Sequence, residues 1–275
     1  MITSAANERI KNIRKLHERK ARQESGLFLV EGLRIVAEAV EQGARLDTLV
    51  VAPELLKSTF GQQLAAQQAQ HGVPVLEVSA EVFQRLSVKE GPQGIAAVVR
   101  QQWLDLSAVR LESAETLSQE KRSSGTWVAL DSVADPGNLG TILRTHDAVG
   151  GAGVILLDQS TDPYDPSAAR ASMGALFSQK LVRATFAEFA AWKRQSGLPI
   201  VGTSDKAKAD YHVYRYPPAL VVLMGSERQG LQEQHLALCD EVVSIPMLGK
   251  SDSLNLAVAT GVVLYEILNQ RRERR

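Results

Sequence analysis

Residues 241–267, EVVSIPMLGKSDSLNLAVATGVVLYEI, constrain the fold of this 275-residue chain more than any other stretch. Val242–Ile245 is predicted to be a short strand that ends at Pro246, because proline cannot donate a hydrogen bond to a sheet. A polar loop over 249–253 follows. The run 254–268 then predicts a buried helix, since it is long, mostly apolar and rich in alanine and leucine.

The start of this helix carries polar residues whose role the sequence leaves open. Ser251, Asp252 or Ser253 can cap the helix by accepting from its free N–H groups. Asn255 stands beside them in an otherwise apolar stretch, where a polar amide has no packing use. It either caps the helix as well or holds a polar ligand, because helix N-termini attract anions and polar groups.

Charge and cysteine content exclude several classes of protein. The 31 basic and 31 acidic residues balance, so global charge gives no argument for a nucleic-acid partner. Cys239 is the single cysteine, which excludes a disulfide framework within the chain, and the five histidines lack metal-ligand spacing. We therefore expect a cytoplasmic protein without a metal site. We also expect no signal peptide and no membrane partner, because no apolar run is long enough to span a bilayer.

Strands and helices alternate along the chain, with one interruption. Residues 1–100 predict an α/β module that begins with a basic helix over 4–20, whose charges either meet phosphates or are simply solvated. Residues 101–125 are poor in apolar side chains and are predicted to be a linker. Residues 126–275 predict a second module, a mostly parallel sheet with helices on both faces.

Polar residues of the second module follow its strands, and ligands of such sheets bind at the carboxyl ends of the strands. Asn138 follows the strand 127–130, and Arg144 comes six residues later, so we expect both to face the loop end of the sheet. Taken alone, Asn138 could equally be a helix cap and Arg144 a surface arginine.

The loop 225–230 and the start of the last helix are the other two polar segments. Glu227 lies between Gly225 and Gly230, and glycines let the backbone approach a ligand closely. The alternative is an ordinary turn with a capping carboxylate. Sequence signatures of the phosphate-binding loop, the dinucleotide fold and the G-x-S-x-G nucleophile elbow are missing.

Three segments contain these loops: NLGTILRTHDAVG (138–150), LVVLMGSERQGL (220–231) and SIPMLGKSDSLNLAVATGVVLYE (244–266). They closely resemble motifs 1, 2 and 3 of the SpoU (TrmH-like) RNA ribose 2′-O-methyltransferases, of the SPOUT superfamily. Residues 8–99 resemble the substrate-binding domain, of ribosomal protein L30e type, that many members carry. The resemblance implies a SPOUT-type parallel sheet with a C-terminal trefoil knot, plus an N-terminal L30e-like α/β domain.

The resemblance also implies a cofactor, a site and an assembly. The cofactor is S-adenosyl-L-methionine (SAM), expected against the backbone of Gly225, Ile245 and Leu254, with Thr203, Met247 and Ser253 nearby. The polar set that matches the family's functional residues is Asn138, Arg144, Glu227, Ser253 and Asn255. Members are homodimers whose active site draws on both subunits.

We expect Arg144 to clamp phosphate and stabilise developing negative charge, because a guanidinium with a pKa above ~12 is a poor base. A role as the base stays open. Asn138 is expected to orient the ribose or Arg144, and Glu227 to hold Arg144 or a backbone N–H. Ser253 and Asn255 are expected to shape the hydroxyl pocket.

The expected partner is structured RNA, with ribosomal RNA favoured over transfer RNA, and no DNA. The alternatives are a transfer-RNA ribose methyltransferase and a non-catalytic RNA-binding protein that retains the fold. A base methyltransferase and a generic α/β nucleotide-binding domain explain the three motifs less well. Which RNA and which nucleotide are modified, and whether the protein serves housekeeping or antibiotic resistance, stay open.

Overall fold

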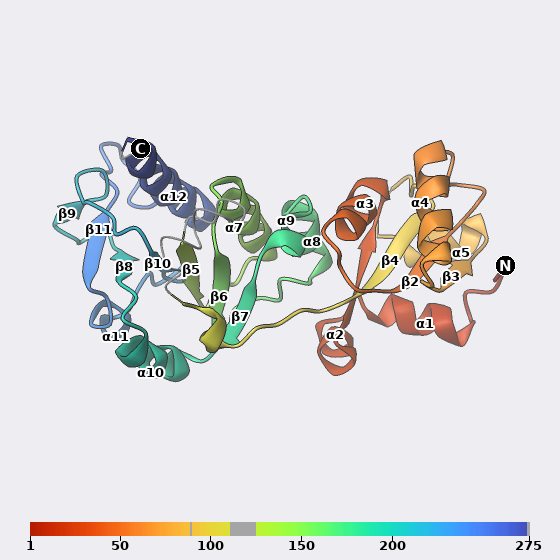
Figure 1. Ribbon diagram of the computed structural model, residues 1–275, viewed down its shortest axis with the longest axis horizontal. Helices are drawn as coiled ribbons and strands as arrows, with labels where there is room; N and C mark the ends of the chain where they lie inside the picture. Colours follow the sequence, from red (N-terminus) through yellow and green to blue (C-terminus); the bar gives the residue numbers. More distant parts are fainter. Residues whose placement is uncertain (89, 111–124, 274–275) are drawn as a thin grey trace. The chain divides into compact units, whose positions relative to one another are not determined.

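The computed structural model describes residues 1–88, 90–110 and 125–273 (Figure 1). The chain divides into two compact units. Unit 1 contains Met1–Gln101 together with Tyr164–Phe177, and unit 2 contains Gln102–Pro163 and Ser178–Arg275. The inclusion of 164–177 in unit 1 differs from the predicted division, which assigned everything after 126 to one domain. Most of the predicted linker, over 111–124, lies outside the described residues.

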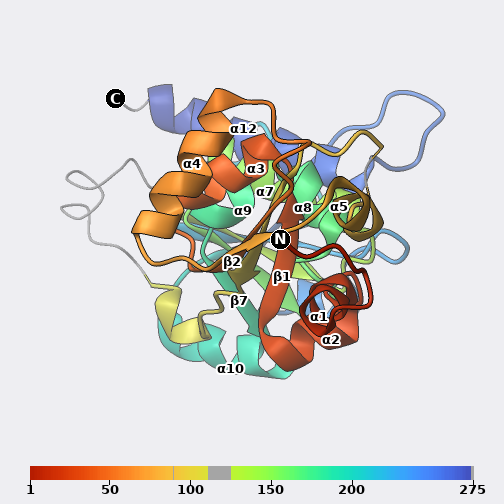
Figure 2. The same ribbon diagram turned by 90° about the vertical axis from the view of Figure 1, so that its right-hand side faces the viewer.

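Unit 1 is built on a four-stranded sheet in the order β1-β4-β2-β3. Its strands are β1 (Leu27–Glu31), β2 (Leu46–Val51), β3 (Val75–Glu77) and β4 (Ile95–Arg100). Helices α1 (Glu8–Lys15) and α5 (Ala80–Leu86) share one hydrophobic cluster with the sheet. Figure 2 shows α3 (Leu33–Glu41) and α4 (Thr59–Gln70) together on the side of the sheet away from α1.

The basic helix predicted over 4–20 forms but is shorter, because α1 ends at Lys15 and a second helix, α2 (Arg19–Ser25), follows. The Arg22 side chain explains the break. It is 1% exposed and donates from Nη1 to the carbonyls of Leu16 and His17, at 3.0 and 2.8 Å. These carbonyls accept from a guanidinium instead of continuing the helical ladder, so the chain turns.

The segment of unit 1 that comes from later in the chain packs against this turn. It contains α8 (Pro166–Ala171) and most of α9 (Ala175–Ser178). Arg22 Nη2 donates to Asp165 Oδ2 at 3.1 Å, and Asp165 is itself the N-cap of α8. Tyr164 packs on Phe28 of β1 with ring centroids 4.6 Å apart. One buried arginine thus joins three separate pieces of unit 1.

Unit 2 contains a seven-stranded sheet in the order β7-β6-β5-β10-β8-β11-β9, in which every neighbouring pair is parallel. The predicted parallel sheet is confirmed. The strands are β5 (Thr126–Asp131), β6 (Gly153–Leu157), β7 (Leu181–Ala184), β8 (Ile200–Thr203), β9 (Ala209–Asp210), β10 (Leu220–Met224) and β11 (Glu241–Ser244). The trefoil knot that the resemblance implies stays a prediction.

Helices cover both faces of this sheet. Figure 1 shows α7 (Pro136–Ala148) and α12 (Leu256–Glu273) on one face and α10 (Phe186–Ser196) on the other, with α11 (Glu233–Leu236) near α10. A short 3-10 helix, η1 (Leu106–Ala108), precedes β5 in the chain. Across the ranges that the structure describes, no helix combines the length and apolar character needed to cross a membrane.

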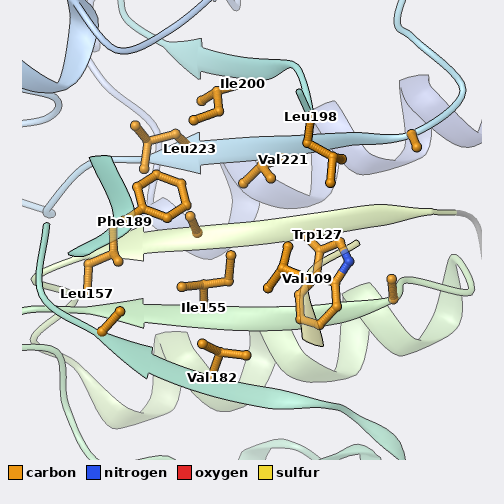
Figure 3. Packing of buried hydrophobic residues seen from close by; sticks show 14 of the residues in the cluster. Val109, Trp127, Ile155, Leu157, Val182, Phe189, Leu198, Ile200, Val221 and Leu223 are labelled. Carbon is orange, nitrogen blue, oxygen red and sulfur yellow. The ribbon is translucent and has the colours of Figure 1, made fainter. Parts of the chain in front are cut away.

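The face under α10 forms a tightly packed core (Figure 3). Phe189 of α10 is fully buried among strand side chains that include Ile155 and Leu223. Trp127 of β5 belongs to the same cluster, and its ring would lie 2.4 Å from a Cβ atom at Gly153. Such close packing makes the sheet a rigid support for the loops at the carboxyl ends of its strands.

Replacing Arg22 by methionine should lower the free energy of unfolding of unit 1 by about 2–4 kcal/mol. The change leaves buried carbonyls without their donor and Asp165 without its cation. Urea unfolding followed by circular dichroism measures this. The control is Lys20→Met on the same helix, at a side chain that is 84% exposed. Equal stability of the two variants would contradict the anchoring role of Arg22.

Candidate active site

A cavity of about 940 Å³ lies at the carboxyl ends of β8, β10 and β11, beside the start of α12. This is the edge of a parallel sheet at which ligands usually bind. The predicted site residues that line it are Asn138, Thr203, Gly225, Glu227, Ile245, Met247, Ser253, Leu254 and Asn255. Loops far apart in the sequence therefore meet in one place, as the strand-end argument predicts.

Glu227 is the hydrogen-bonding centre of this cavity. Its Oε2 accepts from the backbone N–H of Ala134 at 3.1 Å, and its Oε1 accepts from Asp135 N at 3.3 Å and Asn138 Nδ2 at 3.2 Å. Partial burial acts to raise the pKa of Glu227, but hydrogen bonds from its own backbone N–H and from these three donors outweigh burial and hold the pKa below its ordinary value. Of the two predicted roles for Glu227, the structure shows the one that binds backbone N–H groups.

Asn138 links Glu227 to the start of the last helix, α12. Asn255 Nδ2 donates to Asn138 Oδ1 at 3.0 Å. The Oδ1 atom of Asn255 accepts from the N–H groups of Ala257 and Val258, at 2.9 and 3.3 Å. The structure therefore shows the capping role of Asn255, while its Nδ2 is engaged by Asn138; the role of holding a polar ligand stays a prediction.

Two helix caps that the sequence allowed do not form. The predicted cap from 251–253 does not form, since Ser253 Oγ donates to Asp252 Oδ1 at 3.3 Å and Asn255 takes the capping position. Asn138 does not cap α7 either. The cap is Asp135, whose Oδ1 accepts from Asn138 N at 2.7 Å. Asn138 lies in the first turn of α7. Its side chain does not cap the helix and instead bonds to Glu227 and Asn255 in the cavity.

Arg144 is not among the residues that line the cavity. It lies on α7 with an exposed side chain. Six residues at about 100° each turn the helix by about 600°, which places Arg144 about 120° around the axis from Asn138. The expectation that both residues face the loop end of the sheet is therefore wrong within one chain. Thr145, the next residue, faces α12 near Gly261.

Gly225 is required for a reason that differs from the expected one. A Cβ atom at this position would lie 2.1 Å from the carbonyl carbon of Gly230, the residue that closes the loop through a bridge with Ser226. Gly230 itself has a φ of +61°, which glycine adopts without strain. The two glycines therefore shape the loop that holds Glu227, and the close approach is between two backbone segments.

The cavity suits a nucleoside cofactor in size and chemistry. Its volume falls near the upper end of the usual range for ligand sites, and it combines apolar walls with polar rims. Four charged residues that the sequence analysis missed also line it: Asp205, Lys206, Arg228 and Glu233. Asp205 and Lys206 follow the end of β8, so the same strand-end argument could have found them. In the part of the chain that the structure describes, no cluster of His, Cys, Asp and Glu could hold a metal ion.

Two substitutions at Asn255 should separate its cap from its contact with Asn138. Asn255→Ala removes both and should cost about 1 kcal/mol of stability, whereas Asn255→Ser can still cap α12. Neither variant can donate to Asn138 Oδ1, because alanine has no donor and the serine side chain is too short to reach that atom. We expect both variants to lose catalytic rate about equally, with only the alanine variant less stable. Wild-type rate in Asn255→Ser would show that the contact with Asn138 is unimportant.

Comparison with known proteins agrees with this geometry. Residues 125–265 match the sequence model of the SpoU rRNA Methylase family, and residues 7–97 match that of an MRM3-like substrate binding domain. The chain is 33% identical to a 23S rRNA (uridine(2479)-2′-O)-methyltransferase of Streptomyces viridochromogenes, over 93% of this chain and 87% of the relative. It is 28% identical to the Bacillus subtilis 23S rRNA (guanosine(2553)-2′-O)-methyltransferase RlmP, over 97% and 98%.

A solved structure is similar over nearly the whole length. The AdoMet-bound rRNA methyltransferase from Sinorhizobium meliloti superposes with a TM-score of 0.85 at 36% identity, covering 99% of this chain and 97% of that one. The match includes both modules, and the family match covers all three loops of the cavity. The protein therefore belongs to the SpoU rRNA methylase family.

Proposed function

We propose that this protein methylates a ribose 2′-hydroxyl of ribosomal RNA in the cytoplasm. The observation that carries the proposal is the cavity in which Glu227, Asn138 and Asn255 form one connected polar cluster at the sheet edge. Family membership and the named activities of the Streptomyces and Bacillus relatives support the same reaction. S-adenosylmethionine, when bound, would supply its sulfonium methyl group to the ribose 2′-oxygen; the S–CH₃ bond would break to leave the thioether S-adenosylhomocysteine, and the hydroxyl proton would pass to water.

The cavity residues divide into a part that holds the cofactor and a part that meets the ribose. The backbone of Gly225, Ile245 and Leu254 would hold the cofactor, with Thr203, Met247 and Ser253 close by. Support comes from their shared position in one cavity whose walls also include Met224 and Leu231. Apolar walls exclude water and favour a planar purine, while backbone groups give directional hydrogen bonds.

Asn138 is the residue best placed to orient the ribose. One hydrogen of its Nδ2 goes to Glu227, and its Oδ1 already accepts from Asn255. The amide nitrogen carries a second hydrogen, which can donate to a ribose oxygen. The ionised Glu227 fixes the amide plane, so that the donor is aligned before the RNA binds.

Arg144 would complete the site of a second subunit in a homodimer. It is exposed on α7, outside the cavity of its own chain, and α7 packs against α12. Val258 and Tyr265, two large apolar side chains of α12, are 52% and 53% exposed and so leave apolar surface on this helix. We propose that these helices form the subunit contact and that Arg144 then clamps the target phosphate at the partner's ribose site.

The reaction is tested with methyl-labelled S-adenosylmethionine and unmodified ribosomal and transfer RNA. After digestion, mass spectrometry locates the label. We expect label on a ribose 2′-oxygen of ribosomal RNA at a single site. Label on a base, or on transfer RNA alone, would overturn the proposed acceptor. Cofactor binding without any transfer would favour a non-catalytic RNA-binding protein.

Arg144→Ala should abolish transfer and leave the affinity for S-adenosylmethionine within about twofold of wild type, because the side chain lies outside the cavity. Arg215→Ala, at another exposed arginine of unit 2, is the matched control. Mixing Arg144→Ala with Asn138→Ala subunits should restore about a quarter of wild-type activity, since half of the dimers are mixed and each has one intact site. No recovery after subunit exchange would exclude a shared site.

A further inference from the structure

A second cavity, of about 210 Å³, lies entirely within unit 1. It is bordered by the turn between α1 and α2, the junction of β1 with α3, the loop before β4, and α8. Its lining residues are His17, Leu29, Val30, Glu31, Gly32, Arg34, Ile35, Val88, Gln93, Pro166, Ala169, Arg170 and Met173. None of these belongs to the cavity of unit 2, so this is a separate site.

The walls of this cavity are predominantly apolar. Val30 and Leu29 of β1, Ile35 of α3, and Ala169 and Met173 of the α8 segment supply them. Small apolar sites accept flat rings well, because a rigid ring buries much of its surface at little conformational cost. The position of α8 is fixed by the bond from Arg22 to Asp165, so the cavity is preformed.

Two cations border the cavity without internal partners. Arg34 and Arg170 are both exposed, and within the described residues neither side chain makes a hydrogen bond or ion pair. The nearby carboxylate, Glu31, is engaged by Ser87 Oγ at 2.5 Å and by Val88 N at 3.4 Å. The two guanidinium groups are thus available for an anion from outside, and guanidinium matches the geometry of phosphate.

Gln93 offers a hydrogen bond at the cavity. Its Oε1 accepts from Leu33 N at 2.9 Å, which leaves its NH₂ group as a donor. His17 also lines the cavity, and its Nε2 lies 2.9 Å from the Leu86 carbonyl, which can only accept, so Nε2 carries the proton of that bond. The amide donor of Gln93 can pair with a carbonyl or ring nitrogen at the edge of a nucleobase.

We infer that this cavity binds a single unstacked nucleotide of the RNA substrate, with its base inside and its phosphates on Arg34 and Arg170. Apolar walls, an amide donor for the base edge and rim cations for phosphate form a combination by which proteins recognise unpaired RNA nucleotides. The site lies mainly in residues 7–97, which match a substrate binding domain. The identity of the RNA rests on the proposed function, but the nucleotide chemistry rests on this cavity alone.

The first test removes the rim charges from the full-length protein. Binding of a ribosomal RNA fragment that the protein methylates is measured at several salt concentrations by fluorescence anisotropy. Arg34→Gln/Arg170→Gln should raise Kd about tenfold and reduce the slope of log K against log salt by about 1.4, since each phosphate on single-stranded RNA contributes about 0.7. The matched control is Arg45→Gln/Arg85→Gln, two exposed arginines of unit 1 outside the cavity.

The second test locates the base. Ultraviolet cross-linking of the same complex, followed by mass spectrometry, should find one nucleotide on peptides that contain His17 or Met173. The cross-link should disappear in the Arg34→Gln/Arg170→Gln variant and persist in the control. A cross-link confined to other surfaces, or equal loss of RNA affinity in both double variants, would overturn the inference.

Titration of AMP, GMP, CMP and UMP into the protein distinguishes a site for a free nucleotide from a site for a nucleotide within RNA. Micromolar binding of one of them, with RNA affinity unchanged in the double variant, would assign the cavity to a free nucleotide and overturn the inference. The proposed function fails separately, when the wild-type protein transfers no methyl group to ribosomal RNA. If transfer occurs and cofactor affinity is the same in all variants, the RNA measurements test this cavity by itself.

Discussion

The loop before α7 and the loop 225–230 meet at the Glu227 carboxylate, and the direction of every hydrogen bond that follows is set by this charge. Because the carboxylate can only accept, Asn138 must present its NH₂ group to it. The Oδ1 atom of Asn138 then has to face Asn255, which donates and turns its own oxygen to the start of α12. A charge on one strand-end loop thereby orders two amides and a helix terminus, with no ambiguity in amide orientation.

Much of the fold could be predicted from local pattern. The strands of unit 2 are short apolar runs that alternate with helical segments, a pattern with few solutions other than a parallel sheet. The failures have long-range causes. Arg22 breaks the basic helix by donating to carbonyls five and six residues away and to a carboxylate in a distant segment, and no local propensity encodes this. Strand β9, with only two residues, carries too little pattern to be recognised.

The site shows the same division between local and distant information. Position at a strand end was enough to predict that Asn138, Glu227 and Asn255 lie in one cavity, whereas Thr203 was expected only from the family resemblance. Partners were harder to predict, because the distance between loops depends on the whole sheet. Helical geometry alone could have corrected the prediction for Arg144, since a step of six residues does not return to the helix face that carries Asn138. The contacts of Asn138 and Asn255 could be found only from the folded structure.

The discontinuity of unit 1 has a consequence for biosynthesis. Its last segment, Tyr164–Phe177, lies between β6 and β7 in sequence, although Tyr164 packs on Phe28 of β1. A ribosome adds about 5–20 residues per second, so the first hundred residues wait several seconds for the segment that completes their surface. During that interval Arg22 lacks its carboxylate and Phe28 lacks its aromatic neighbour. The nascent N-terminal module therefore exposes a surface for which a chaperone can compete, and its maturation is coupled to synthesis of the neighbouring unit.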